Sequence, residues 1–196
     1  MQLLFVNACI SERGQESRTL KLSRAFLDAY LETHPADTVV TADLSRLPIQ
    51  PFDREALEAR NAKASQGDFS GPEFQLARDF QSANKIVVAA PFWDLSFPAI
   101  LRVYIEHISA CGLCYHYDEQ GCHGDCRAER LAYLTTGGDC EKPESLGALY
   151  WKQLAEMFGI PRFDYVFAGG LDVIPEKAPE LLEPALEKAR KLGREF

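Results

Sequence analysis

The sequence has no excess of positive charge, because 21 Lys and Arg residues stand against 29 Asp and Glu and give a net charge of −8. Binding nucleic acid through phosphate contacts needs a basic surface, which argues against that class of partner. No apolar run approaches the roughly 18 residues of a membrane-spanning helix. The segment Met1 to Val6 lacks the basic start and cleavage site of a secretory signal. We therefore expect a cytoplasmic protein that binds neither nucleic acid nor membrane.

Two phosphate-binding fingerprints are also missing. The sequence contains neither G-x-G-x-x-G, which marks dinucleotide-binding folds, nor the P-loop pattern G-x-x-x-x-G-K-[ST]. It has no internal repeat and no low-complexity segment. With 46% hydrophobic residues, the 196-residue chain can bury one sizeable core, and we expect residues 1–196 to form a single domain.

What the sequence does contain is a series of apolar strands separated by amphipathic helices. Lys85 to Ala90 is apolar and β-branched without alternation, which is typical of a strand buried on both faces. The expected strands span residues 2–7, 38–42, 85–90, 130–135 and 162–168, and the main helices 17–32, 72–82, 97–109, 146–158 and 179–194. This alternation predicts an α/β fold with a five-stranded parallel sheet, flavodoxin-like order 2-1-3-4-5 and helices on both faces.

Two segments interrupt this pattern. Residues 53–66 are polar and helix-prone, which indicates an exposed excursion, and residues 111–127 form an irregular insert with a short hairpin through Tyr115 to Tyr117. Both segments would add walls around a site, which favours an enzyme over a small electron carrier.

The first βα loop, from Ala8 to Thr19, is predicted to bind phosphate. Ser17, Arg18 and Thr19 open a helix, where free N–H groups and the helix dipole favour an anion, and Arg13 can add charge. Ser17 can equally be a helix N-cap and nothing more. The loop of roughly ten residues exceeds the ~2–6 residues of an ordinary βα connection, which favours a functional role.

Two further loops should meet it at the carboxyl edge of the sheet. Pro91 to Phe97 carries aromatic rings and backbone N–H groups that suit a flat cofactor such as a flavin. The loop from Thr136 to Cys140 contains Gly137 and Gly138, which let the backbone approach a ligand or serve only as a tight turn.

With these three loops the chain resembles the NAD(P)H-dependent oxidoreductases of flavodoxin-like fold, which include quinone reductases and FMN-dependent azoreductases. The resemblance implies that the first turn holds the FMN phosphate, the second loop wraps the isoalloxazine and the glycine loop approaches its pyrimidine edge. The implied cofactor residues are Cys9, Arg13, Ser17, Arg18, Thr19, Pro91, Phe92, Trp93, Asp94, Leu95, Thr136, Gly137 and Gly138. Azoreductases often have serine in place of Cys9 and asparagine in place of Asp94.

The implied reaction passes a hydride from NADH or NADPH to FMN and then two electrons to a quinone, azo or nitroaromatic acceptor. Phe97, Tyr115 and His116 are candidates for the substrate side, although ordinary packing explains any single aromatic residue as well. No catalytic acid or base is assigned. The resemblance also implies a homodimer. The alternative from another class is a flavodoxin-type electron carrier without a substrate.

Four of the six cysteines cluster at Cys111, Cys114, Cys122 and Cys126. They suggest a metal site or a metal or redox sensor, and Cys140 beside the glycine loop would belong to a thiol-redox role. The C-x2-C and C-x3-C pairs are only eight residues apart, however, whereas common zinc modules separate their pairs by roughly 12–20 residues. We therefore expect free thiols and no bound metal.

Overall fold

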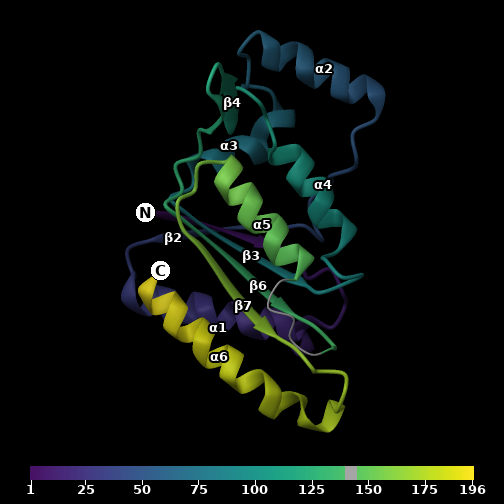
Figure 1. Ribbon diagram of the computed structural model, residues 1–196, viewed down its shortest axis with the longest axis vertical. Coiled ribbons are helices and arrows are strands. Elements are labelled where there is room, and N and C mark those ends of the chain that lie inside the picture. Colours follow the sequence, from purple (N-terminus) through teal and green to yellow (C-terminus); the bar gives the residue numbers. More distant parts are fainter. Residues whose placement is uncertain (140–144) are drawn as a thin grey trace.

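Five parallel strands form the centre of the molecule. The computed structural model describes residues 1–139 and 145–196. Its main sheet contains β1 (Gln2–Asn7), β2 (Thr38–Asp43), β3 (Lys85–Pro91), β6 (Arg130–Thr136) and β7 (Phe163–Ala168). Their order is β2-β1-β3-β6-β7, and each neighbouring pair runs parallel (Figure 1). Because β4 and β5 belong to a separate hairpin, this is the predicted 2-1-3-4-5 order, and the flavodoxin-like architecture is confirmed.

Alternate residues of each strand feed two separate cores. In β1, Leu3 and Phe5 pack on one face of the sheet, whereas Leu4 and Val6 pack on the other. The central strand β3 is buried at every position from Lys85 to Ala90. This double burial explains why its sequence is continuously apolar rather than alternating.

Helices α1 (Arg18–Thr33) and α6 (Ala178–Glu195) cover one face of the sheet and lie side by side (Figure 1). Gly193 permits their close approach, because a Cβ at this position would lie 2.3 Å from the carbonyl oxygen of Phe26. The close contact with α6 therefore fixes the position of α1 on the sheet.

Helices α3 (Gln75–Ser82), α4 (Ala99–Ile108) and α5 (Leu146–Met157) cover the other face. The segment 72–82, expected as one helix, divides into the 3-10 turn η2 (Pro72–Phe74) and α3. The helix expected from residue 97 begins at Ala99. The reason is that the residue before a proline disfavours helical geometry, and Phe97 precedes Pro98.

Helix α2 (Arg54–Ser65) stands at the periphery, as its polar sequence predicts (Figure 1). Arg60 is its one buried residue among those described. The Arg60 guanidinium lies 5.2 Å from the ring centre of Phe52 and 5.4 Å from that of Phe74, and Nη2 donates a 3.2 Å hydrogen bond to the carbonyl oxygen of His107. The Arg60 side chain thus attaches α2 to the rest of the molecule, together with the ion pair between Lys63 and Glu73.

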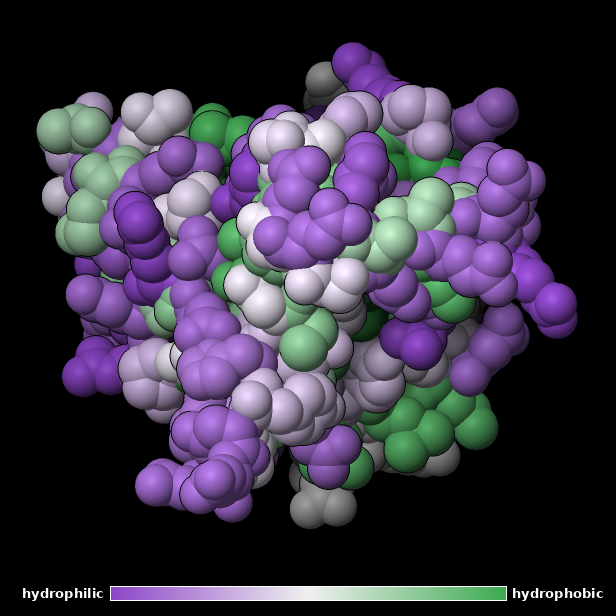
Figure 2. Space-filling model, turned by 90° about the horizontal axis from the view of Figure 1, so that it is seen from above, coloured by the Kyte–Doolittle hydropathy of each residue, from purple (hydrophilic) through white to green (hydrophobic). Residues whose placement is uncertain are grey.

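The insert at 111–127 contains the predicted hairpin, formed by β4 (Tyr115–Asp118) and β5 (Gly121–Gly124). The face of the molecule seen in Figure 2 is mostly hydrophilic, and its hydrophobic residues occur in small, separate groups. Within the described residues, no helix is both long and apolar enough to span a membrane.

Candidate cofactor site

A pocket of about 180 Å³ lies where β1, β3, β6 and β7 end. It brings together all of the predicted cofactor residues except Asp94 and Leu95, and it adds Ser11, Leu171 and Asp172. Its lining consists of Cys9, Ser11, Arg13, Ser17, Arg18, Thr19, Pro91, Phe92, Trp93, Thr136, Gly137, Gly138, Leu171 and Asp172. The parallel sheet therefore gathers segments from four distant parts of the chain at one edge.

The first loop reaches this pocket through the 3-10 turn η1 (Gly14–Glu16) and the start of α1. The Ser17 hydroxyl accepts a 3.3 Å hydrogen bond from the N–H of Leu20, so Ser17 is a helix N-cap and also lines the pocket. Thr19 Oγ1 and Thr136 Oγ1 are 2.6 Å apart and hydrogen-bonded, which ties this helix terminus to the glycine loop. The positive end of the α1 dipole thus points at the pocket.

Cys9 contributes a neutral thiol to the same wall. Burial raises the pKa of Cys9 to about 12, although hydrogen bonds with Ser17 and Thr19 oppose the shift. Its Sγ donates a long 3.9 Å hydrogen bond to the carbonyl oxygen of Ala89. Because the thiol stays protonated near neutral pH, cysteine at this position adds no negative charge to an anion site.

The second loop is backbone-strained. The N–H of Ser96 donates to the carbonyl oxygen of Trp93 over 2.8 Å and closes a turn in which φ is 49° at Asp94 and 66° at Leu95. A left-handed backbone is uncommon for a residue other than glycine and costs on the order of 1–3 kcal/mol. Within residues 1–139 and 145–196, no protein acceptor is recorded for the N–H groups of Trp93, Asp94 and Leu95. These donors are available to a ligand.

The glycine loop fits tightly between its neighbours. A Cβ on Gly137 would lie 3.1 Å from the ring of Phe167 and 3.3 Å from that of Phe92, whereas a Cβ on Gly138 would lie 2.4 Å from Asp172 Oδ2. The close packing of the neighbouring side chains therefore requires glycine at both positions, and the approach of this backbone to a ligand stays a prediction.

A fourth loop, Gly170–Asp172, was missed by the sequence reasoning. Its backbone N–H groups donate to carbonyl oxygens of the glycine loop. The N–H of Gly170 donates to Asp139 over 2.5 Å, that of Leu171 to Gly137 over 3.3 Å and that of Asp172 to Gly138 over 3.0 Å. Asp172 Oδ1 also accepts a 2.6 Å hydrogen bond from Arg18 Nη1. The available signal was Gly169-Gly170 directly after the last strand, which places a further loop at the same sheet edge.

The three predicted substrate residues do not line this pocket. The Phe97 ring packs against that of Tyr150 at 5.7 Å, just outside it. Tyr115 and His116 belong to the hairpin that precedes Arg130, the first residue of β6, whereas the pocket lies at the last residue, Thr136. The strand between them is about 20 Å long. The hairpin instead contacts the end of α5, so a role for it in this pocket has no support within one chain.

The four clustered cysteines do not converge on one point. Cys114 is buried and Cys126 half-buried, with Cys126 Sγ donating to the carbonyl oxygen of Cys114 over 3.6 Å, whereas Cys111 and Cys122 are exposed. Among the described residues, no three His, Cys, Asp or Glu side chains form a group that could hold a metal ion. Cys140 lies outside the described residues.

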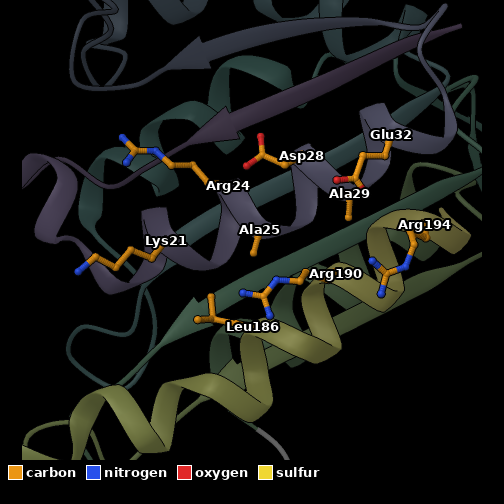
Figure 3. A pocket seen from close by; sticks show the side chains of 9 residues that line it. All are labelled: Lys21, Arg24, Ala25, Asp28, Ala29, Glu32, Leu186, Arg190 and Arg194. Carbon is orange, nitrogen blue, oxygen red and sulfur yellow. The ribbon is translucent and has the colours of Figure 1, made fainter.

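A larger hollow of about 470 Å³ lies between α1 and α6 (Figure 3). Its walls alternate cations such as Lys21 and Arg190 with anions such as Asp28 and Glu32, and no aromatic ring lines it. It also lies along the helices rather than beyond the ends of the strands. The smaller pocket at the sheet edge is therefore the candidate cofactor site.

The sheet order, the helices on both faces and a pocket at the switch point between β1 and β3 define an α/β protein of the doubly wound class. The chain belongs to a family described as "Flavodoxin-like fold", which matches residues 1–192.

Relatives match over the whole chain. A protein of Clostridium acetobutylicum named FMN-dependent NADH:quinone oxidoreductase 2 is 33% identical over 200 residues, which cover 100% of this chain and 99% of the relative. An FMN-dependent NADH:quinone oxidoreductase of Clostridium beijerinckii is 31% identical with the same coverage. The crystal structure of an azoreductase from Bacillus anthracis superposes with a TM-score of 0.86 at 28% identity and covers all of both chains.

Replacing Leu95 with glycine should leave the free energy of unfolding unchanged or raise it by up to about 1 kcal/mol, because glycine accepts a positive φ without strain. The Leu95 side chain is 60% exposed, so little burial is lost. Leu95→Val should lower the same quantity by about 1 kcal/mol, since β-branched residues tolerate this backbone worst. Urea denaturation measures both values.

Leu149→Gly is the matched control, because Leu149 is 45% exposed on ordinary helical backbone in α5. It should cost about 1 kcal/mol. An equal loss in Leu95→Gly would contradict the left-handed turn.

Proposed function

We propose that this chain is an FMN-dependent NAD(P)H oxidoreductase that transfers two electrons from NADH or NADPH to a quinone, azo or nitroaromatic acceptor. The observation that carries the proposal is the convergence of a helix N-terminus, an aromatic loop and a glycine loop in one pocket. The names of full-length relatives, FMN-dependent NADH:quinone oxidoreductases, support the same activity. They favour an enzyme over an electron carrier.

The residues present fit FMN. Ser17, Arg18 and Thr19 would hold the phosphate at the α1 N-terminus, with Arg13 adding charge and the neutral Cys9 adding none. Although the whole chain has a net charge of −8, the two arginines give this pocket the cationic character that a phosphate dianion needs. Anion binding is thus concentrated where the backbone also offers N–H donors.

The second and third loops suit the flavin ring. Pro91, Phe92 and Trp93 line the pocket, and the strained turn at Asp94 and Leu95 presents backbone N–H groups for the polar edge of the ring. Gly137 and Gly138 would allow close approach to its pyrimidine side. When bound, FMN supplies the two-electron chemistry, while these residues position the ring and provide hydrogen-bond donors. Phe97 lies just outside the pocket and remains our candidate for the acceptor side.

We further propose a cytoplasmic homodimer. All cysteines of the described residues are free thiols, which suits a reducing compartment. The insert at 111–127 exposes Cys111, Cys122 and Tyr117, the last of them 66% exposed, and a second copy would cover this surface.

Ser17→Asp should release FMN without unfolding the protein. Aspartate is as good a helix N-cap as serine, but its carboxylate would face the phosphate. Ser17→Asn is the matched control, because it has the same shape and capping ability without charge. In fluorescence titrations we expect the aspartate variant to bind FMN at least 100-fold more weakly than the asparagine variant. Equal FMN affinities of the two variants would show that the phosphate does not bind beside Ser17.

Steady-state oxidation of NADH or NADPH with a quinone should follow ping-pong kinetics, because donor and acceptor would use one flavin face in turn. Initial rates at several fixed quinone concentrations should give parallel double-reciprocal lines. Intersecting lines require both substrates to be bound together and would rule out the shared face. Absence of quinone turnover in protein loaded with FMN would favour the electron carrier.

Light scattering at micromolar protein concentration should give twice the chain mass of 22.0 kDa. Tyr117→Asp should shift the mass toward the monomer if the hairpin is in the interface, because it places a charge on a surface that association would bury. Lys152→Asp, on the exposed side of α5, is the control and should leave the mass unchanged. A monomeric wild-type protein would refute the dimer.

A further inference from the structure

An ion pair joins Arg18 and Asp172, which both line the candidate cofactor pocket. Arg18 Nη1 and Asp172 Oδ1 are 2.6 Å apart, although the two residues are separated by 154 positions in the sequence. The Arg18 side chain is 26% exposed and that of Asp172 is 67% exposed. Both residues line the pocket, so the pair belongs to its wall rather than to the remote surface.

The backbone holds Asp172 in this position. Its N–H donates a 3.0 Å hydrogen bond to the carbonyl oxygen of Gly138. Its carboxylate occupies the space that a side chain at position 138 would fill, 2.4 Å from an ideal Cβ. The carboxylate is therefore directed at the glycine loop and at Arg18, and its place is defined by two neighbouring elements.

A carboxylate at this position opposes a phosphate in two ways. Carboxylates and phosphates bind the same fork of guanidinium N–H groups, so Asp172 and an anionic ligand compete for Arg18. Two anions in one small pocket also repel each other. Among the residues that the structure describes, the charged ones that line the pocket are Arg13, Arg18 and Asp172, so the Asp172 carboxylate offsets one of two positive charges.

We propose that Asp172 competes with the flavin phosphate for Arg18, so that it weakens FMN binding and keeps the cofactor exchangeable. This inference rests on the proposed function, because it takes FMN as the ligand. Asp172 acts on the phosphate end alone. It should therefore reduce the affinity for FMN but not for riboflavin, which has the same ring and no phosphate.

The test compares Asp172→Asn with the wild type in titrations of flavin fluorescence, with FMN and riboflavin as separate probes. We expect the variant to bind FMN about tenfold more tightly and riboflavin within twofold of the wild type. In an Arg18→Gln background, the same substitution should raise FMN affinity by clearly less than tenfold, because only the repulsion between the two anions is left to relieve. Asp172→Ser should repeat the result of Asp172→Asn.

Asp28→Asn is the matched control, since it makes the same chemical change and the same change in net charge. Asp28 is exposed on α1, ten residues from Arg18 and thus about 15 Å along the helix, beyond the Debye length at physiological salt. It should leave FMN affinity unchanged.

Four results would overturn the inference. An unchanged FMN affinity of Asp172→Asn would show that Asp172 has no effect on FMN binding. A lower affinity would show that Asp172 positions Arg18 for the phosphate. An equal gain for riboflavin would indicate a change of pocket shape. An equally large gain in FMN affinity in the Arg18→Gln background would show that Asp172 does not act through Arg18. If the wild type binds neither flavin, the proposed function itself fails, which is a distinct outcome.

Discussion

Parallel pairing of the strands is the constraint on which the rest of the structure depends. Because all five strands run in the same direction, every loop that follows a strand emerges at one edge of the sheet. Residues from the segments 9–19, 91–93, 136–138 and 171–172 therefore meet in one pocket, although these segments are widely spaced in the sequence. The two buried faces of the sheet supply the rigidity, so that the loops carry the chemistry without carrying the fold.

The fold could be predicted from the sequence because each strand and main helix has a recognisable local pattern of apolar residues. The unbroken apolar run of β3 and the amphipathic helices gave boundaries that lie within a few residues of those observed. Contacts between residues that are far apart in the sequence could not be predicted. The pairing of Arg18 with Asp172 joins two ends of the chain, and nothing near either residue indicates its partner. Tyr115 and His116 have suitable chemistry, but the direction in which α4 ends places their hairpin at the opposite edge.

The pocket and the turn at Asp94 and Leu95 that adjoins its aromatic loop combine features that are uncommon on an ordinary protein surface. Asp94 and Leu95 both have positive φ, Gly137 and Gly138 are pressed against neighbouring side chains, and a carboxylate sits beside the arginine that should attract anions. The positive φ angles of Asp94 and Leu95 cost stability and are held in place by the surrounding fold. Local departures from favourable geometry of this kind are expected where a site binds a ligand rather than where it only packs.

Helix α2 has a different relation to the fold. It contacts the rest of the molecule through the Arg60 guanidinium near two aromatic rings and through the ion pair between Lys63 and Glu73, and it contributes no strand to the sheet. We expect a helix with so little buried surface to open locally at a lower free energy than the sheet. Because Arg60 is the buried residue of this helix, exposed positions within residues 54–65 should tolerate substitution better than positions in the sheet.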